Sequence, residues 1–411
     1  MIEPLWLIAG GASAVAFYMA WSIGANDVAN SMSTAVGAKA ITHKQAVIIA
    51  GVLVFLGALL VGPHVTETIK SEIIKVDIIP PNLLILGFIS ALLAAAIWSS
   101  LSTWREMPIS TTHSIIGALM GFGIIAGGVS SVNWMKIGSV ALSWVLSPVF
   151  GCILAFLVFK IIVRLIFAKE EPVKSAKVVG PIIIGATAFL ISASLLLKTP
   201  ISKNFNITDY LGLVISLIAS ILVSIIGIIL LRKIQAKKEE DYYTVENIFR
   251  KLQVVTSCYV AFSIGANDVA NAIGPVAGII PLAETGHLNL ATPIPYWLLI
   301  LGGIGIAIGA MTWGKRVMKT VGYRITNLTN TRGFSVDFGA ATTVLVASKL
   351  GMPISTSHTV VGAVIGVGLA RGLEAVDLRV IKKIIISWLL TLPIAAFTCI
   401  GIFLCLRLIM G

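Results

Sequence analysis

The stretch Trp21-Ser-Ile-Gly-Ala-Asn-Asp-Val-Ala-Asn30 decides the fold, because it occurs a second time as Phe262-Ser-Ile-Gly-Ala-Asn-Asp-Val-Ala-Asn271. A second motif, Met107-Pro-Ile-Ser-Thr-Thr-His113, returns as Met352-Pro-Ile-Ser-Thr-Ser-His358. The copies lie 241 and 245 positions apart and keep the same order. Self-similarity at nearly one spacing indicates an internal duplication. We therefore divide the chain into repeat one (residues 1–166), a linking region of two helices and a linker (167–245), and repeat two (246–411).

Composition places the chain in a lipid bilayer. Of its 411 residues, 57% are hydrophobic and only 12% are charged, and the mean hydropathy is +0.99. About 20 apolar residues are needed to cross the hydrocarbon core as a helix. Uncharged stretches of about this size cover residues 46–63, 83–103, 137–159, 178–197, 210–231, 295–314 and 384–406. The pattern predicts an all-α polytopic membrane protein.

The distribution of charge predicts the orientation of the two repeats. The net charge of +12 comes from Lys and Arg residues that gather in short loops, notably 160–177, 232–251 and 315–332, whereas residues 284–294 contain none. Basic loops face the cytoplasm and anionic lipid, so we infer no nucleic-acid partner. The alternation predicts a multi-pass protein of the plasma membrane with both termini outside. The two repeats then cross in opposite senses, which is typical of secondary transporters with a midplane site.

The two long segments that carry the first motif are expected to depart from simple spanning helices. The run 4–38 would extend about 52 Å as a helix, beyond a ~30 Å hydrocarbon core, so it must tilt strongly or break. Its counterpart, 252–283, is interrupted by Asp268 at the same motif. Gly24 and Gly265 would let the backbone unwind at this point.

Two further segments are expected to be re-entrant hairpins. Residues 338–348 are too few to span before the polar loop that follows, and we extend this interpretation from 338–368 to 83–128 by symmetry. The predicted fold is thus a pair of inverted-topology repeats with broken helices and re-entrant hairpins.

The first motif places a carboxylate inside an apolar segment. On insertion scales such a residue costs about 2.5–3.5 kcal/mol, which makes it a functional candidate by default. Carboxylate and amide oxygens suit a hard cation, here sodium or a proton. The candidate ligands of the two copies are Asn26, Asp27, Asn30, Asn267, Asp268 and Asn271. The alternative is that these side chains only join neighbouring helices.

The second motif is typical of the start of a helix. Pro108 and Pro353 cannot continue a preceding helix, and Ser110 and Ser355 are favourable N-cap residues. A helix amino terminus presents free N–H groups and the positive end of its dipole, so it attracts anions. Hydroxyls in the first turn add hydrogen-bond donors, at Thr111, Thr112, Thr356 and Ser357. The alternative is ordinary helix capping.

Together the two motifs predict the chemistry of the substrate. Ionised carboxylates only accept hydrogen bonds, so an anion beside Asp27 or Asp268 must carry its own O–H donors. Phosphate keeps a proton near neutral pH, whereas sulfate does not. Bound cations would cancel the remaining repulsion, and cation and anion would then bind cooperatively.

Other polar residues near the second motif have several interpretations. A Ser-His-Asp hydrolase is one alternative for His113 and His358, but two symmetric copies do not fit a single nucleophile. We expect each His to pack behind a hairpin tip and to donate a hydrogen bond that fixes it. Arg105 and Glu106 are expected to pair with each other, and we assign no role to Lys349.

The duplicated Gly-Ala-Asn-Asp-Val-Ala-Asn and Pro-Ile-Ser-Thr-Thr/Ser-His motifs resemble the signature of the inorganic phosphate transporter family, the sodium- or proton-coupled phosphate permeases. The short linking region is similar to that of prokaryotic members. The resemblance implies that phosphate is held by Asp27, Ser110, Thr111, Thr112, Asp268, Ser355, Thr356 and Ser357. It implies that the coupling cations are held by Asn26, Asp27, Asn30, Asn267, Asp268 and Asn271.

The sequence therefore predicts a secondary active symporter that imports inorganic phosphate with sodium or protons by alternating access. It is not expected to be an enzyme, and no cofactor is expected; bound sodium ions are expected as a co-substrate. A homodimer is one assembly compatible with this interpretation. A sulfate permease, an intramembrane hydrolase and a passive channel are the alternatives.

Overall fold

The protein is a bundle of α-helices. The computed structural model describes residues 3–69, 73–198, 206–234, 240–285, 294–349 and 355–410. The elements of repeat one are α1 (Glu3–Gly37), α2 (His43–Ile69), η1 (Val76–Ile78), α3 (Pro81–Trp104), α4 (Thr111–Gly127), η2 (Val129–Ser131), α5 (Trp134–Ile162) and the π-helical turn η3 (Val163–Phe167). The linking region contributes α6 (Pro172–Lys198) and α8 (Asp209–Arg232). The elements of repeat two are α9 (Asp241–Thr285), α10 (Tyr296–Trp313), α11 (Lys315–Lys319), the π-helical turn η5 (Thr320–Arg324), α12 (Asn330–Lys349), α13 (Thr356–Leu369), η6 (Leu373–Ala375) and α14 (Leu378–Met410).

The structure confirms an all-α polytopic membrane protein. Among the described residues, 8 helices are long and apolar enough to cross a membrane, and each of the seven uncharged stretches of the sequence coincides with one of them to within a residue or lies inside it. The least buried is α8, which exposes most of its apolar side chains. An exposed surface of this kind is stable when lipid covers it.

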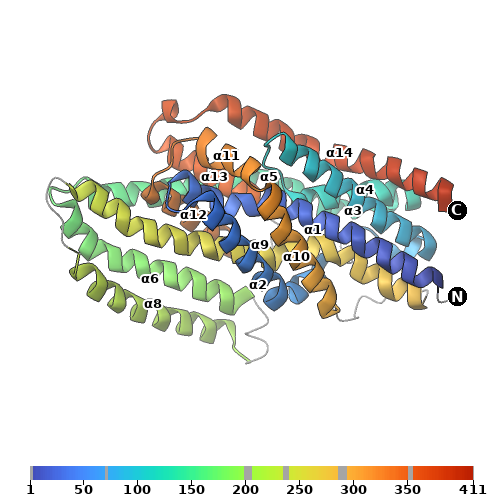
Figure 1. Ribbon diagram of the computed structural model, residues 1–411, viewed down its shortest axis with the longest axis horizontal. Helices are drawn as coiled ribbons and strands as arrows, with labels where there is room; N and C mark the ends of the chain where they lie inside the picture. The colour runs from blue at the N-terminus through green and yellow to red at the C-terminus, as the bar shows by residue number, and fades with distance from the viewer. Residues whose placement is uncertain are drawn as a thin grey trace.

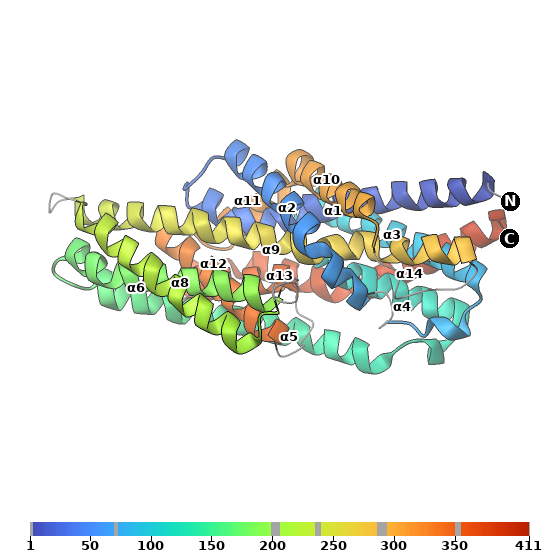
Figure 2. The same ribbon diagram turned by 90° about the horizontal axis from the view of Figure 1, so that it is seen from below.

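The two long motif-bearing helices are continuous. Helix α1 is helical across Gly24 and Asp27, and α9 is helical across Gly265 and Asp268 (Figure 2). The expected unwinding at these glycines is therefore wrong. The run 4–38 was expected to tilt or to break, and it does not break. Membrane helices of 35 and 45 residues exceed the hydrocarbon thickness, so they must tilt or extend beyond it.

The glycines of this motif serve close helix packing instead. A Cβ atom at Gly24 would overlap the carbonyl oxygen of Ile306 on α10, and one at Gly265 would overlap that of Val54 on α2. Each motif helix therefore packs backbone to backbone against the second helix of the other repeat. Small residues at such contacts are typical of membrane helix pairs, where close approach supplies the van der Waals attraction.

Two helical hairpins bring the second motif to the interior. Helices α3 and α4 lie toward the end of the molecule that holds both termini, whereas α12 and α13 lie toward the opposite end (Figure 1). The first arm of the second hairpin, helix α12, begins at Asn330, earlier than residue 338, the start expected from the sequence. Contacts between the repeats fix the returning arms, since α4 packs on α14 and α13 packs on α5.

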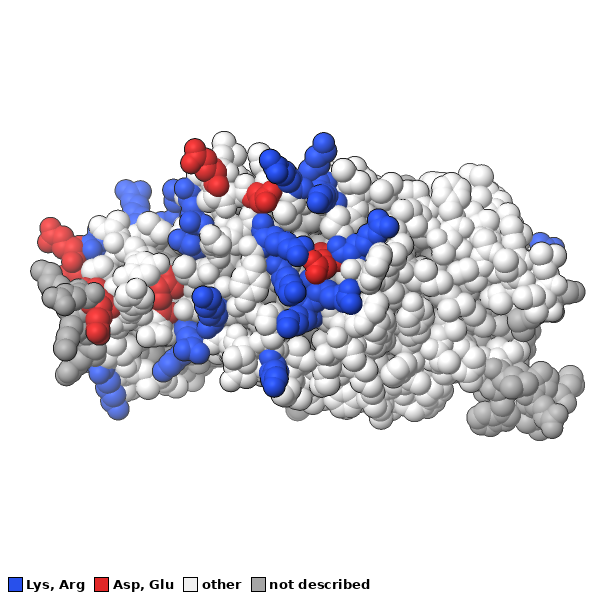
Figure 3. Space-filling view, turned by 45° about the horizontal axis from the view of Figure 1, so that its top comes forward, with Lys and Arg blue, Asp and Glu red and all other residues white. Residues whose placement is uncertain are grey.

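Helices α6 and α8 form a peripheral pair (Figure 1), in which α6 contacts α9, α12 and the turn η3. Two hydroxyls of α8 join the pair, because Ser220 and Ser224 donate to the carbonyl oxygens of Gly185 and Pro181 at 2.8 and 2.9 Å. Basic side chains gather over the part of the surface nearer this pair, and the opposite part is almost free of charge (Figure 3). The charge asymmetry gives the molecule two chemically different ends.

Candidate functional site

Asp27 is the centre of the site. Its side chain is 2% exposed, and it accepts hydrogen bonds from hydroxyls of both hairpins. The Thr111 hydroxyl, from the first turn of α4, donates to one carboxylate oxygen. The Ser357 hydroxyl, from the first turn of α13, donates to the other at 2.7 Å. The amino termini of two helices from different repeats therefore meet at one carboxylate.

The two copies of the first motif reach across to each other's hairpin. The Asn30 amide on α1 donates to the Ser357 hydroxyl at 2.7 Å. The Asn271 amide on α9 donates to the Thr112 hydroxyl at 3.0 Å. These bonds are equivalents of each other under the duplication. Each repeat thus supplies an amide that orients a hydroxyl of the other repeat.

Asn26 has a different environment from the other motif amides. Its amide nitrogen donates to the Thr103 hydroxyl at 2.9 Å and to the Met107 carbonyl oxygen at 3.0 Å. Its side-chain oxygen accepts the backbone N–H of Ile109 at 3.0 Å. Asn26 therefore holds the loop of the first hairpin, and only one lone pair of its oxygen remains for another ligand.

Several buried oxygens in the site lack a hydrogen-bond partner among the described residues. They are one carboxylate oxygen of Asp268 and the amide oxygens of Asn30 and Asn271. Asp268 is 5% exposed and lies close enough to Asp27 to interact electrostatically with it. Buried polar atoms are almost always paired, so an unpaired set indicates a ligand or ion site. All three atoms are oxygens with lone pairs that no hydrogen bond uses, and oxygen lone pairs are the ligands that a hard cation requires.

The remaining residues of the predicted site lie next to those described above, on α4, α9 and α13 or at their starts. The Ser110 and Ser355 hydroxyls accept the backbone N–H groups of His113 and His358, each at 3.3 Å, so both act as helix caps. Thr356 lies in the first turn of α13, and Asn267 lies one residue before Asp268 on α9. Both are half-buried.

The two histidines pack against each other behind the hairpin tips. Their ring centroids lie 4.9 Å apart. The ring of His113 accepts a hydrogen bond from the Trp144 indole at 3.2 Å, the reverse of the expected direction, and His358 stacks on Trp388 at 3.8 Å. The Ser110 and Ser355 hydroxyls bond to backbone N–H groups, and among the described residues no hydrogen bond joins either hydroxyl to a histidine ring, as a Ser-His relay requires.

Sequence analysis missed a buried carboxylate besides Asp27 and Asp268. Asp337 on α12 is fully buried and accepts hydroxyl hydrogen bonds from Thr34 at 2.8 Å and Ser257 at 2.5 Å, with Thr256 at 3.4 Å. It joins α1, α9 and α12. The signal was present, because an Asp beside an apolar run is a functional candidate. The duplication does not mark this residue, because the equivalent position in repeat one is Leu92.

One expected ion pair is wrong. Glu106 pairs with Arg324, 2.6 Å away, and not with its neighbour Arg105. Glu106 has a left-handed backbone (φ 60°), and Arg105 extends over the Trp104 ring. The Lys349 side chain and Pro353, which the sequence singled out, lie outside the described residues.

Comparison with known proteins identifies the family. A model of the phosphate transporter family matches residues 23–399. The chain belongs to this family. A chain of Pyrococcus horikoshii provisionally named a phosphate permease is 55% identical over 96% of both chains. The chloroplastic inorganic phosphate transporter 2-1 of Arabidopsis thaliana is 40% identical over 92% of this chain and 69% of that protein.

A solved structure supports the same assignment. The chain is similar to a structure described as the sodium-dependent phosphate transporter, with a TM-score of 0.89 and 47% identity over 98% of this chain and 100% of that chain. This member of the phosphate transporter family is therefore a phosphate-transporting membrane protein and not an enzyme.

Proposed function

We propose that the protein is a secondary active symporter that imports phosphate with sodium by alternating access. The observation that carries the proposal is the meeting of Thr111 and Ser357, from hairpins of different repeats, at the Asp27 carboxylate. Hydroxyls can turn from a carboxylate to a phosphate oxygen, while a protonated phosphate oxygen donates to Asp27. Backbone N–H groups of α4 and α13 add donors without a formal positive charge.

In this proposal the bound phosphate lies between the two hairpin tips. Thr112 and Thr356 supply further hydroxyls, and Ser110 and Ser355 hold the helix starts in place. Asp268 completes the site from repeat two. A site assembled from both repeats can change its access when one half moves, and inverted repeats meeting at the midplane are the usual basis of alternating access.

Sodium is the preferred coupling ion. Two buried carboxylates beside an anion require positive charge, and the unpaired oxygens of Asn30, Asp268 and Asn271 are acceptors that suit a cation. Asn26 and Asn267 would contribute their remaining acceptor capacity. The sodium dependence in the name of the 47% identical solved relative supports sodium over protons.

The decisive experiment measures labelled phosphate uptake into proteoliposomes that contain the purified protein. We expect accumulation above equilibrium with an inward sodium gradient and little with a pH gradient alone. Uptake driven only by the pH gradient would show that protons, and not sodium, are the coupling ions. Equal inhibition by sulfate would indicate a general oxyanion permease, and phosphate equilibration without accumulation would indicate a channel.

We also propose a plasma-membrane location with both termini outside. The two ends of the chain lie at the same end of the molecule (Figure 1), away from most of the basic surface (Figure 3). Because Lys and Arg are in excess on the cytoplasmic side of membrane proteins, the basic end would face the cytoplasm and the termini would lie outside. Labelling of terminal tags on intact cells tests the orientation, and crosslinking in the membrane tests whether the protein is a homodimer.

A further inference from the structure

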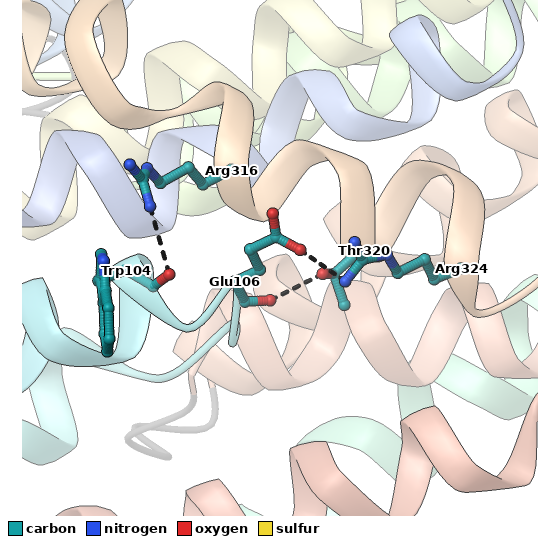
Figure 4. Close-up of polar contacts among 5 residues, drawn as sticks. All are labelled: Trp104, Glu106, Arg316, Thr320 and Arg324. Carbon is teal, nitrogen blue, oxygen red and sulfur yellow. Dashed lines mark hydrogen bonds and ion pairs between the residues drawn. The ribbon is translucent and has the colours of Figure 1, made fainter.

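A short segment of repeat two covers the tip of the first hairpin. We define the strap as residues 315–324, which form α11 and η5, and the first tip as residues 104–110, the last residue of α3 and the loop that follows it. Three contacts join them (Figure 4): Arg324 pairs with the Glu106 carboxylate at 2.6 Å, the Thr320 hydroxyl donates to the Glu106 carbonyl oxygen at 2.7 Å, and Arg316 reaches the Trp104 carbonyl oxygen at 3.4 Å.

The strap is itself fixed to the body of the protein. The Tyr323 hydroxyl donates to the Val36 carbonyl oxygen near the end of α1 at 2.8 Å. Gly322 approaches the backbone of α1 so closely that a Cβ atom there would lie 2.5 Å from the Ser33 carbonyl oxygen. The Arg316 guanidinium lies over the Trp313 ring, 4.8 Å from its centroid. The strap is therefore a supported element that can hold another one.

The first tip connects the strap to the phosphate-binding residues without a gap. Beyond Glu106, the Met107 carbonyl and the Ile109 N–H bond to Asn26, and the Pro108 carbonyl accepts the Trp388 indole at 3.0 Å. Ser110 then caps α4, and Thr111 reaches Asp27. A displacement of Glu106 would therefore be transmitted directly to the hydroxyls that face Asp27.

The sequence of the second tip differs at the position that carries the ion pair in the first. The position equivalent to Glu106 in the second tip is Gly351, which has no carboxylate. In repeat one, the connector equivalent to the strap contacts the α4–α5 turn instead, through the bridge between Ile74 and Val132. Among the described residues, the two connectors of the duplicated core therefore make different contacts, and the one in repeat two holds the first tip.

We infer that the strap is a latch on the first hairpin, with Arg324 and Glu106 as positioning residues for phosphate. The inference rests on the proposed function of the site. With the ion pair formed, the first tip is held beside Asp27, and the hydroxyls at the start of α4 are positioned to bond to that carboxylate. With it broken, the tip moves away from the strap and opens the site on that side. The partly exposed positions of both groups, 51% for Arg324 and 27% for Glu106, allow the pair to break during a transport cycle.

The test combines neutral variants with a charge exchange in the full-length protein. Glu106→Gln and Arg324→Gln should each raise the KM for phosphate roughly two- to fivefold, the range of a partly exposed ion pair. The double variant Glu106→Arg with Arg324→Glu should restore the wild-type KM. Glu171→Gln is the matched control, because it breaks the exposed Lys174–Glu171 pair of 2.9 Å and should leave KM unchanged.

Hydrogen exchange separates the latch from the proposed function, since it needs no transport. Amide exchange across residues 104–112 should accelerate in both neutral variants, return to the wild-type rate in the charge-exchanged variant and stay unchanged in Glu171→Gln. Wild-type exchange in both neutral variants, or no recovery on charge exchange, would overturn the latch. Absent uptake by the wild-type protein, with the exchange pattern as expected, would instead reject the proposed function alone.

Discussion

Asp27 and Asp268 occupy the same position in two copies of one motif, yet their surroundings differ. Both oxygens of Asp27 accept hydroxyl hydrogen bonds from the hairpins, whereas one oxygen of Asp268 has no partner among the described residues. The neighbouring helices, not the motif, make this difference. It suggests a division of work, in which Asp27 organises the phosphate hydroxyls and Asp268 is available to a cation.

The largest expected effect is that of Asp27→Asn. The amide would present N–H donors to Thr111 or Ser357, which already donate there, and two charge-assisted bonds would be lost. At about 1.5–3 kcal/mol for each such bond, phosphate uptake should fall at least roughly hundredfold at every sodium concentration. Initial rates in proteoliposomes measure this, and unchanged uptake would remove Asp27 from the site.

Asp268→Asn should act mainly on sodium. Removing a carboxylate with a free oxygen weakens a cation site, so the half-saturating sodium concentration should rise roughly tenfold, and high sodium should restore part of the uptake. Sodium titrations at fixed phosphate make the measurement. If Asp268→Asn and Asp27→Asn respond identically to sodium, the proposed division between the two carboxylates is wrong.

Ser357→Ala and Thr112→Ala compare the two hairpins directly. Ser357 bonds to both Asn30 and Asp27, whereas Thr112 accepts one bond from Asn271. At about 0.7 kcal/mol for a neutral bond, and more for a bond to a charge, the phosphate KM should rise at least roughly tenfold for Ser357→Ala and roughly threefold for Thr112→Ala. The reverse order would show that the second pair contributes more to binding.

The smallest effect concerns Asp337, a buried carboxylate that the duplication does not repeat. Asp337→Asn replaces charge-assisted bonds with neutral ones, so the stability of the purified protein should fall by about 1 kcal/mol. Thermal unfolding in detergent measures the change. Asp77→Asn, at an exposed position in η1, is the control and should leave the unfolding midpoint unchanged. Equal midpoints in all three proteins would mean that this cluster adds nothing to stability.

Local pattern predicted the helical spans, the helix caps at Ser110 and Ser355, and the residue types of the site. These features depend on near neighbours in the chain, so the sequence contains them directly. Two expectations about local structure were wrong. Unwinding at Gly24 did not occur because α10 packs against that glycine, and Glu106 found Arg324 instead of Arg105. Both outcomes depend on elements more than 200 positions away. Thr320, which bonds to Glu106 from the same segment as Arg324, is 214 positions from it in the chain.

The amino-acid sequence by itself determined that the protein lies in a membrane, that its core is duplicated, and which amides, carboxylates and hydroxyls the core contains. Tertiary structure alone decided which of these groups meet. Identical motifs acquired different partners because each buried polar atom takes whatever donor or acceptor the adjoining helices place within about 3 Å. The latch on the first tip and the buried Asp337 cluster arise in the same way, from contacts that no repeat could form alone.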